Sequence, residues 1–345
     1  MKNLIMGMLL TALPLSAFAV NINVTNVVCT IPGGSVSTPG TPCYQMDQAI
    51  KGEINGDIPR VSIDKYGSGV ANTTALSMKG QGSDYAENFT YFIFKPSLGF
   101  AVDGDIDKPE SASGFGVGGA LTVGLNLDML PFDKIGSIEM KNLDIFLSFM
   151  NYDLDQTQDD TAFNGELSSF GVFARYRFME GKDIFPGYML EWGGVHLHTG
   201  LQRNTMGLKL TQSFKDQTVT AGGETATFGN SSAVFNIDSS VTSIPIEIST
   251  YLRMLYVFTL YTGAGFDYNM GSTDIDLTAS GSVASTGYSA DINANEGGSG
   301  KPEATNFRGF LGLQFNVPLV RLYVHVNKGL GNDLKGVNFG AKITY

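Results

Sequence analysis

The sequence predicts an all-β fold: a transmembrane antiparallel up-and-down β-barrel of about ten strands, within a range of roughly 8–12, with an N-terminal extension or plug. Three observations support this fold class. Apolar and polar residues alternate with a period of two in ten segments, the N-terminus has the form of an export signal, and no run of about 20 apolar residues follows it. Helical membrane spans are therefore not expected. A closed barrel can cross a bilayer, because an open sheet leaves its backbone unsatisfied in lipid.

Residues 1–19 are predicted to be a signal peptide. Lys2 supplies the positive charge, Leu4 to Leu15 form a mostly apolar run, and Ala17-Phe18-Ala19 is a cleavage site of the small-x-small type. We expect the mature chain to begin at Val20. No cysteine follows the cleavage site directly, so lipoprotein processing is not expected.

The composition suits a barrel and argues against nucleic acid as a partner. The chain has 43 glycines and 16% charged residues, and its mean hydropathy is +0.03. Its formal net charge of −11 becomes −12 when Lys2 leaves with the signal. Acidic residues concentrate at 103–110 and 153–160. These segments are expected to be solvated loops, with bridging by divalent cations at an outer surface as the alternative.

Residues 20–88 form a separate N-terminal segment, expected in the periplasm or inside the barrel as a plug. The two cysteines of the chain, Cys29 and Cys43, are separated by a spacer rich in Gly, Pro, Ser and Thr. Disulfides persist in exported proteins, so we predict a Cys29–Cys43 bridge. Two thiols without nearby histidines do not favour a metal site.

Secondary structure within this segment is less regular. A short helix is expected at Tyr44–Ile54. A strand pair near Arg60–Asp64 and Ala75–Lys79 is a further alternative that would enlarge the barrel.

Residues 89–345 are predicted to form the barrel itself. Each expected strand has one apolar face, which a soluble β-sandwich would not need on every strand. The predicted strands are residues 92–100, 115–127, 143–149, 170–178, 195–210, 244–252, 258–266, 307–317, 320–326 and 334–345.

The alternation breaks within one strand. Near Arg203–Thr205 the apolar residues change parity, and Met206, Leu208 and Leu210 continue out of phase. Either a β-bulge or the departure of the strand from the lipid zone explains this shift.

The connections alternate between long outer loops and short inner turns, as a barrel with a periplasmic C-terminus requires. The expected outer loops are residues 103–113, 153–166, 213–233, 271–305 and 329–333, and the inner turns are 128–140, 180–188, 252–255 and 316–319. Aromatic residues also sort into two girdles. The inner girdle comprises Tyr176, Phe178, Tyr188, Trp192, Phe315 and Tyr345, and the outer one Phe100, Phe115, Phe149, Phe170, Phe266, Tyr268 and Phe307.

The last twelve residues, LKGVNFGAKITY, alternate throughout and end on an aromatic. Val337, Phe339 and Tyr345 share the apolar face, and Lys342 lies on the polar one. This strand, with the signal peptide and the alternating segments of 89–345, resembles bacterial outer-membrane β-barrel proteins. The resemblance implies a place in the outer membrane of a Gram-negative envelope, contact with outer-membrane lipid and lipopolysaccharide, and insertion by the barrel-assembly machinery through the strand that ends at Tyr345.

The faces opposite the apolar ones are expected to line the lumen. Charges that face lipid near the bilayer midplane cost about 2–4 kcal/mol each, so their confinement to one face favours the barrel. The lumen either holds a mutually paired polar core or presents a basic wall that favours anionic solutes. The lumen-lining candidates are Lys95, Asp144, Arg175, Arg177, His196, His198, Glu247, Asp267, Arg308, Arg321, His325 and Lys342.

The predicted barrel is compatible with three functions. The first is a porin-like narrow channel for small polar, in one version anionic, solutes, since about ten strands enclose little more than side chains. The second is a structural or adhesin-type surface barrel that acts through its long outer loops. The third is an omptin-like outer-membrane protease, which the sequence supports by strand count alone.

No enzymatic activity and no cofactor are expected. His196 and His198 share a face and could bind metal or shuttle protons. No carboxylate or cysteine shares their local motif, so no metal site is predicted. The sequence leaves the oligomeric state open.

Overall fold

The computed structural model describes most of the chain from residue 63 onward, with one short stretch and two single residues before it. The described residues are 22–29, 44, 48, 63–104, 113–131, 133–158, 160–185, 189–221, 224–285, 288–317 and 319–345. The predicted disulfide involves Cys43, which lies outside the described residues, and so does most of the helix expected at 44–54. Both stay predictions. Tyr44 and Gln48 are helical.

In the described part of the chain, ten antiparallel strands form a closed ring, which confirms the predicted barrel. Each strand pairs with its neighbours in the chain, and the last strand pairs with the first. The ring strands are β2 (Phe92–Asp103), β3 (Gly114–Asn126), β6 (Leu143–Gln158), β7 (Thr161–Phe185), β8 (Leu190–Phe214), β10 (Glu224–Met254), β11 (Phe258–Ser285), β13 (Thr305–Asn316), β14 (Arg321–Gly329) and β15 (Leu334–Thr344).

The closing seam joins β15 to β2. Val337 pairs with Phe100, and Ile343 pairs with Phe94. At the end of the seam that holds the C-terminal residue, the Tyr345 carbonyl accepts hydrogen bonds from the backbone N–H groups of Tyr91 and Phe92, at 2.8 and 3.1 Å. The strand that the alternation singled out is thus the one that closes the ring.

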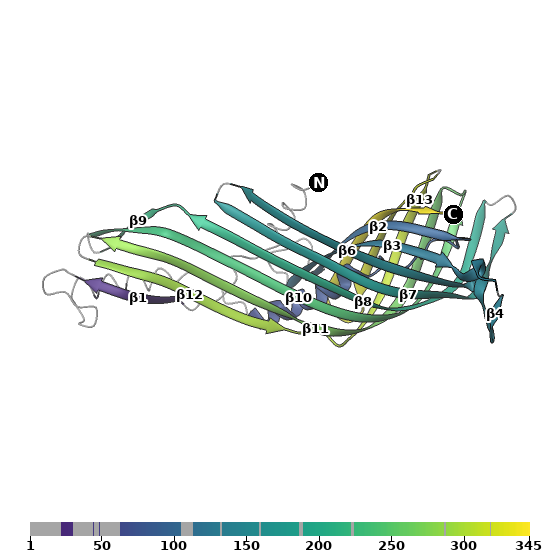
Figure 1. The fold of residues 1–345 in the computed structure, drawn as a ribbon, viewed down its shortest axis with the longest axis horizontal. Coiled ribbons are helices and arrows are strands. Elements are labelled where there is room, and N and C mark those ends of the chain that lie inside the picture. Colours follow the sequence, from purple (N-terminus) through teal and green to yellow (C-terminus); the bar gives the residue numbers. More distant parts are fainter. Residues whose placement is uncertain are drawn as a thin grey trace.

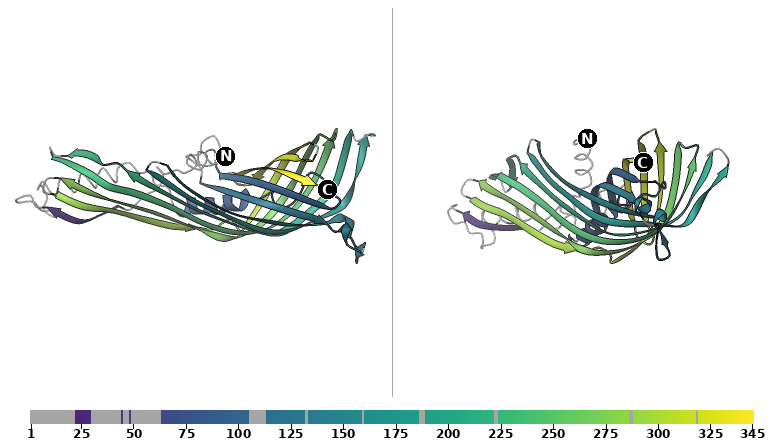
Figure 2. Two further views of the ribbon diagram at one scale, coloured as in Figure 1. Left: turned by 45° about the horizontal axis from the view of Figure 1, so that its top comes forward. Right: turned by 45° about the vertical axis from the view of Figure 1, so that its right-hand side comes forward.

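Half of the ring strands continue far beyond it. Figure 1 shows β6, β7, β8, β10 and β11 running out of the ring into a long curved sheet, and Figure 2 shows its curvature. Three further strands, β12 (Tyr288–Gly300), β1 (Ile22–Cys29) and β9 (Gln217–Ala221), add to this extension by pairing with β11, β12 and β10 respectively. We call this sheet the extension. The prediction of long outer loops at 213–233 and 271–305 was therefore wrong, because most of these residues continue the ladders.

In the extension, the apolar side chains lie on the opposite face of the sheet from those in the ring. Within the ring β8 turns its apolar residues outward, and Leu201 is 51% exposed. In the extension the same strand turns Met206 inward, where it is 0% exposed, with Leu208 and Leu210 beside it. The pairing of β8 with β7 and β10 has no register shift at Arg203–Thr205. The parity change thus marks the departure of the strand from the lipid zone, and the bulge is excluded.

The opposite end of the ring carries short connections. Beyond β3 lie two 3₁₀ turns, η2 (Leu127–Met129) and η3 (Met140–Asn142), and between them the small hairpin of β4 (Lys134–Ile135) and β5 (Ile138–Glu139). The Asn126 side chain accepts from the backbone N–H of Asp128 and caps the first turn. This end corresponds to the predicted inner, periplasmic side.

One long helix enters the ring from the extension. Helix α3 (Ile63–Ser77) contacts β12 of the extension and the ring strands β2, β3, β8, β10, β11 and β15. The alternative strand pair at 60–64 and 75–79 was therefore wrong for the described residues. Phe115, expected in the outer girdle, is buried with Val117 in an apolar cluster that includes Met206 and Leu208 of the extension, because the first half of β3 faces the inner side of the extension there.

Small residues let the helix approach the wall closely. A Cβ on Gly116 of β3 would lie 2.4 Å from the backbone of Thr73, and one on Gly114 would lie 2.2 Å from the backbone of Gly69. A methyl group does not fit at either position. The glycines of β3 and α3 thus set the distance between helix and barrel.

This contact gives a testable expectation. The change Gly116→Ala should lower the free energy of unfolding by about 1–3 kcal/mol, because the new methyl group overpacks the contact between helix and strand. The matched control is Gly309→Ala in β13, where an added Cβ meets no atom within 4 Å. Urea unfolding of the refolded protein in detergent, followed by the fluorescence of Trp192, measures both. Equal stabilities of the two variants would contradict the close contact.

Candidate functional site: the plugged lumen

The interior of the ring is filled by the segment that follows α3, and the C-terminal part of α3 lies at the outer end of the ring. We call α3 together with residues 78–90 the plug. Val70 and Thr74 of the helix and Gln81 of the following segment are each 0% exposed. The structure therefore shows a lumen occupied by the chain itself.

The polar wall residues hold the plug through two clusters of ion pairs. In the first cluster Arg308 of β13 donates to Asp267 of β11 at 2.8 Å and to Glu247 of β10. Lys79 of the plug lies 3.1 Å from the same Asp267 carboxylate. The Tyr85 hydroxyl, also from the plug, donates to Glu247 at 2.6 Å. One wall arginine thus organises two carboxylates that the plug also binds.

The second cluster lies nearer the periplasmic end. Lys342 of β15 lies 2.5 Å from Asp84 and 3.0 Å from Glu87, both plug residues. Arg321 of β14 reaches the Glu87 carboxylate at 3.0 Å. Arg253 of β10 reaches it at 3.6 Å. Arg175 of β7 lies 3.9 Å from the Asp84 carboxylate, so two plug carboxylates are held by cations from four strands.

Arginine 175 of β7 joins the wall to the plug backbone. Its guanidinium donates to Asp144 at 2.6 Å and to the carbonyls of Asp84 and Glu87 at 2.8 and 2.7 Å. Lys95 of β2 likewise donates to the plug carbonyls of Gly80 and Ser83. Buried charges remain stable only when they are paired and hydrogen-bonded, and these groups meet that condition.

The three histidines contact the plug or lie beside it. His198 bonds the Ser83 hydroxyl at 2.8 Å and the Ser249 hydroxyl at 2.7 Å, and its ring stacks on Tyr85 with centroids 4.7 Å apart. His196 bonds the Asn88 side chain at 2.8 Å. His325 lies against the rings of Tyr85 and Phe310. Among the described residues no group of three or more His, Cys, Asp and Glu side chains is arranged to hold a metal ion.

All twelve candidate residues from the sequence face the interior. The structure brings eight of them into direct side-chain or backbone contact with the plug by hydrogen bonds or ion pairs: Lys95, Arg175, His196, His198, Glu247, Asp267, Arg321 and Lys342. Asp144 and Arg308 contact other wall residues that hold the plug. Arg177 bonds Asn142 near the periplasmic end, and the His325 ring lies against the Tyr85 ring of the plug.

The plug residues that complete these clusters were missed from the sequence. Lys79, Asp84, Tyr85 and Glu87 lie in the stretch KGQGSDYAE, which is polar and lacks period-two alternation. The sequence does contain a signal that could have indicated these residues. The stretch places two carboxylates and a lysine directly before the first barrel strand, and the predicted lumen wall has more cations than carboxylates.

The outward face of the ring is mostly apolar and exposed. The charged outward positions Lys328 and Lys335 lie at the outer ends of β14 and β15, away from the middle of the belt. This belt is the surface that lipid tails would cover. Its exposed members include Phe94, Leu125, Leu147, Val172, Leu197, Ile246, Leu260, Leu313, Val324 and Phe339. Within the described residues, no helix has the length and apolar character needed to cross a bilayer.

The closed ring, the apolar belt and the filled polar interior define a plugged ten-stranded β-barrel protein of the bacterial outer membrane. The chain belongs to the Lsa36-like family, whose model matches residues 24–345. No curated protein matches the chain.

Solved outer-membrane structures are similar at low identity. The translocator domain of the autotransporter NalP from Neisseria meningitidis has 9% identity and a TM-score of 0.34, covering 88% of this chain and 98% of that chain. CarO from Acinetobacter baumannii has 12% identity and a TM-score of 0.25, covering 58% and 95%. A FadL homologue from Pseudomonas aeruginosa has 8% identity and a TM-score of 0.25, covering 81% and 99%. The assignment of the barrel rests on the strand pairing of this chain itself.

Proposed function

We propose that this protein is a sealed surface barrel that presents the extension outside the membrane as an interaction surface for a basic partner protein. The observation that carries the proposal is the plug, which occupies the lumen and is held by two clusters of ion pairs. A sealed barrel transports little, whereas five of its strands continue outward into a large sheet. The second of the three sequence-based functions is therefore favoured, and no enzymatic role is included.

The chemistry of the partner follows from the outer face of the extension. Two rows of polar residues cross five neighbouring strands. In the first row Asp153, Glu166, Gly207, Asp238 and Asp274 are direct cross-strand neighbours. In the second row the neighbours are Asp155, Asn164, Lys209, Asn236 and Asp276.

Like charges oppose each other directly in the first row. Asp153 lies opposite Glu166, and Asp238 lies opposite Asp274, and all four residues are exposed. Such pairs destabilise a sheet by a few tenths of a kcal/mol to about 1 kcal/mol each. A partner that supplies Lys or Arg side chains removes this repulsion, so charge complementarity favours a basic surface.

A binding experiment tests this surface. The triple variant Asp153→Asn, Glu166→Gln, Asp238→Asn should bind a lysine-rich peptide about 10-fold more weakly than the unchanged protein, because three surface ion pairs are lost. Binding is measured in detergent at low salt by fluorescence anisotropy, with a glutamate-rich peptide of equal length as the comparison ligand.

The control moves the same charge change to the other end of the barrel. The triple variant Asp133→Asn, Glu180→Gln, Asp183→Asn alters three exposed acids on the periplasmic side. It should leave the affinity for the lysine-rich peptide within about 2-fold. Equal losses in both triples would show a general charge effect and overturn the assigned surface.

A channel that is closed at rest is the second candidate. The specific observation in its favour is that the plug meets the wall through charged and polar groups, so the wall would be wetted if the plug moved. The wall candidates include six Lys and Arg residues and three carboxylates, which would favour small anionic solutes. Conductance of the intact chain and of a chain without the plug distinguishes the two functions.

A further inference from the structure

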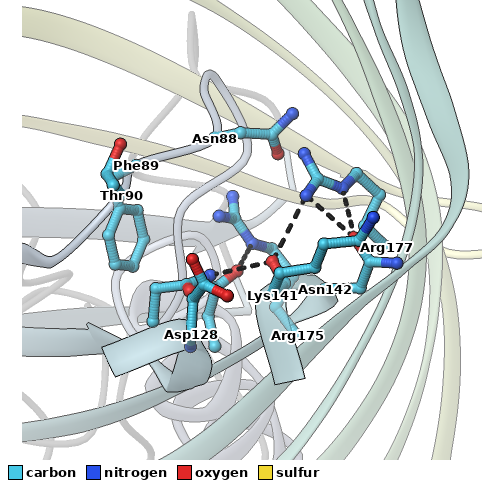
Figure 3. Close-up of a pocket in the computed structure, with 10 residues that line it drawn as sticks. Asn88, Phe89, Thr90, Asp128, Lys141, Asn142, Arg175 and Arg177 are labelled. Atoms are coloured by element: carbon cyan, nitrogen blue, oxygen red, sulfur yellow. Dashed lines mark hydrogen bonds and ion pairs between the residues drawn. The ribbon is translucent and has the colours of Figure 1, made fainter. Parts of the chain in front are cut away.

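A cavity of about 190 Å³ lies at the periplasmic mouth, between the end of the plug and the wall. Figure 3 shows the plug residues Asn88, Phe89 and Thr90 on one side and Arg177, Lys141 and Asn142 on the other. Asp128 lies at its solvent-exposed rim. The cavity is lined by mostly polar residues from β3, η2, η3, β6, β7 and the plug, so several elements of the fold build it together.

Most charged groups of the cavity already have partners. Arg175 and Asp144 pair at 2.6 Å, and Asn126 donates to the same Asp144 carboxylate at 2.8 Å. Lys141 lies 3.3 Å from both Glu139 and Glu180. Its hydrogen bonds to these carboxylates, above all to Glu139, raise the pKa of the Lys141 ammonium. These groups therefore have little charge left for a ligand.

Arg177 is the exception on the positive side. Its guanidinium donates to the Asn142 side chain at 2.8 and 3.1 Å and to the Lys141 carbonyl at 3.2 Å. In the described part of the chain no carboxylate lies within 4 Å of it. The hydrogen bonds fix the planar group in place and leave Nη1 available, so a carboxylate ligand would meet an oriented cation.

Asp128 is the exception on the negative side. Its carboxylate is exposed, and no Lys or Arg of the described residues lies within 4 Å of it. One uncompensated cation and one uncompensated anion thus line the same cavity. A phosphate dianion would be repelled by Asp128, whereas a molecule with both charges would neutralise both groups.

We propose that this cavity binds a small zwitterion with one carboxylate and one ammonium group, of the size of an amino acid or a dipeptide. Arg177 holds the carboxylate, and Asp128 holds the ammonium group. Because Asn88 and Thr90 of the plug line the same cavity, a bound zwitterion also bridges the plug to the wall. The site faces the periplasm and does not depend on the surface proposed for the extension.

Titration calorimetry of the refolded full chain in detergent tests the site. The probes are alanylalanine, which carries both charges, acetate, which carries the carboxylate, and ethylamine, which carries the ammonium group. Alanylalanine should bind more tightly than either fragment. The change Arg177→Gln should weaken the binding of alanylalanine about 10-fold or more, because a charge-assisted contact is lost.

Asp128→Asn separates the two halves of the site. This change should weaken the binding of alanylalanine and leave the affinity for acetate unchanged. The matched control is Arg203→Gln, an exposed arginine on the outer face whose guanidinium bonds Ser240 at 3.2 Å; it should change nothing. Absence of alanylalanine binding to the unchanged protein, or equal affinity in the Arg177→Gln variant, would overturn the site. Equal affinity for acetate and alanylalanine would overturn the assignment of a zwitterion.

Discussion

Replacing Arg308 with methionine is expected to lower the free energy of unfolding by about 3–5 kcal/mol, the usual cost of removing one partner of a buried ion pair. The side chain is fully buried and holds Asp267, Glu247 and Asn327. Methionine leaves the two carboxylates with Lys79 as the remaining cation of the cluster. The cost therefore comes from uncompensated buried charge more than from lost volume.

Urea unfolding in detergent, followed by Trp192 fluorescence, measures this change. Trp192 is the one tryptophan of the chain, and its indole N–H donates to Thr250 of the neighbouring strand at 2.8 Å, so it reports on the barrel wall. The control Arg203→Met removes an exposed arginine and should change stability by no more than about 0.5 kcal/mol.

A second variant tests the cause. Adding Glu247→Gln to Arg308→Met removes one surplus carboxylate and keeps an acceptor for the Tyr85 hydroxyl. The double variant should regain about 1–3 kcal/mol over the single one, because neighbouring sites in one network are not additive. A double variant less stable than Arg308→Met would show that uncompensated buried charge is not the cause of the lost stability.

The ring could be predicted from the sequence because lipid imposes a simple rule on every strand. Most residues that face lipid are apolar, so segments such as 258–266 and 307–317 show the period of two plainly. Short inner turns then fixed the order and direction of the strands. The place of Lys342, Arg308 and Arg175 on the inner wall followed from the same alternation.

The extension could not be predicted in the same way. Residues 271–305 are rich in Gly, Ser and Thr, which are typical of loops and carry little alternation. In the structure these residues pair along β11 and β12, and backbone hydrogen bonds, rather than apolar side chains, define the strands. The parity change near Arg203–Thr205 was the one visible sign that the strands continue outside the lipid.

The plug could be predicted from the sequence only in part. A segment of uncertain structure before the barrel was visible, and a plug was one of its expected positions. Its partners depend on contacts between residues far apart in the chain, such as Asp84 with Lys342, and no local pattern encodes such a pair. The surplus of cations on the predicted wall indicated missing carboxylates without showing where they lie.

Removing the plug is expected to turn a silent barrel into a conducting one. The full chain, refolded and inserted into a planar bilayer, should give no single-channel steps, because residues 78–90 and the C-terminal part of α3 occupy the lumen. A chain that lacks residues 20–88 should give stable steps and prefer chloride to potassium. Its wall then carries Lys95, Arg175, Arg177, Arg308, Arg321 and Lys342 against Asp144, Glu247 and Asp267.

The control variant lacks residues 20–62 and keeps the whole plug, so it should remain silent. In the deletion that conducts, Arg175→Gln together with Arg308→Gln should reduce the preference for chloride, since both side chains line the wall and then lack most of their partners. Steps from the intact chain would show that the lumen is open at rest and would favour the channel over the surface barrel. Silence of the chain without residues 20–88, with its barrel shown to be folded by heat-dependent gel mobility, would mean that the ten-stranded wall closes on itself, and the ion pairs with the plug would then be structural alone.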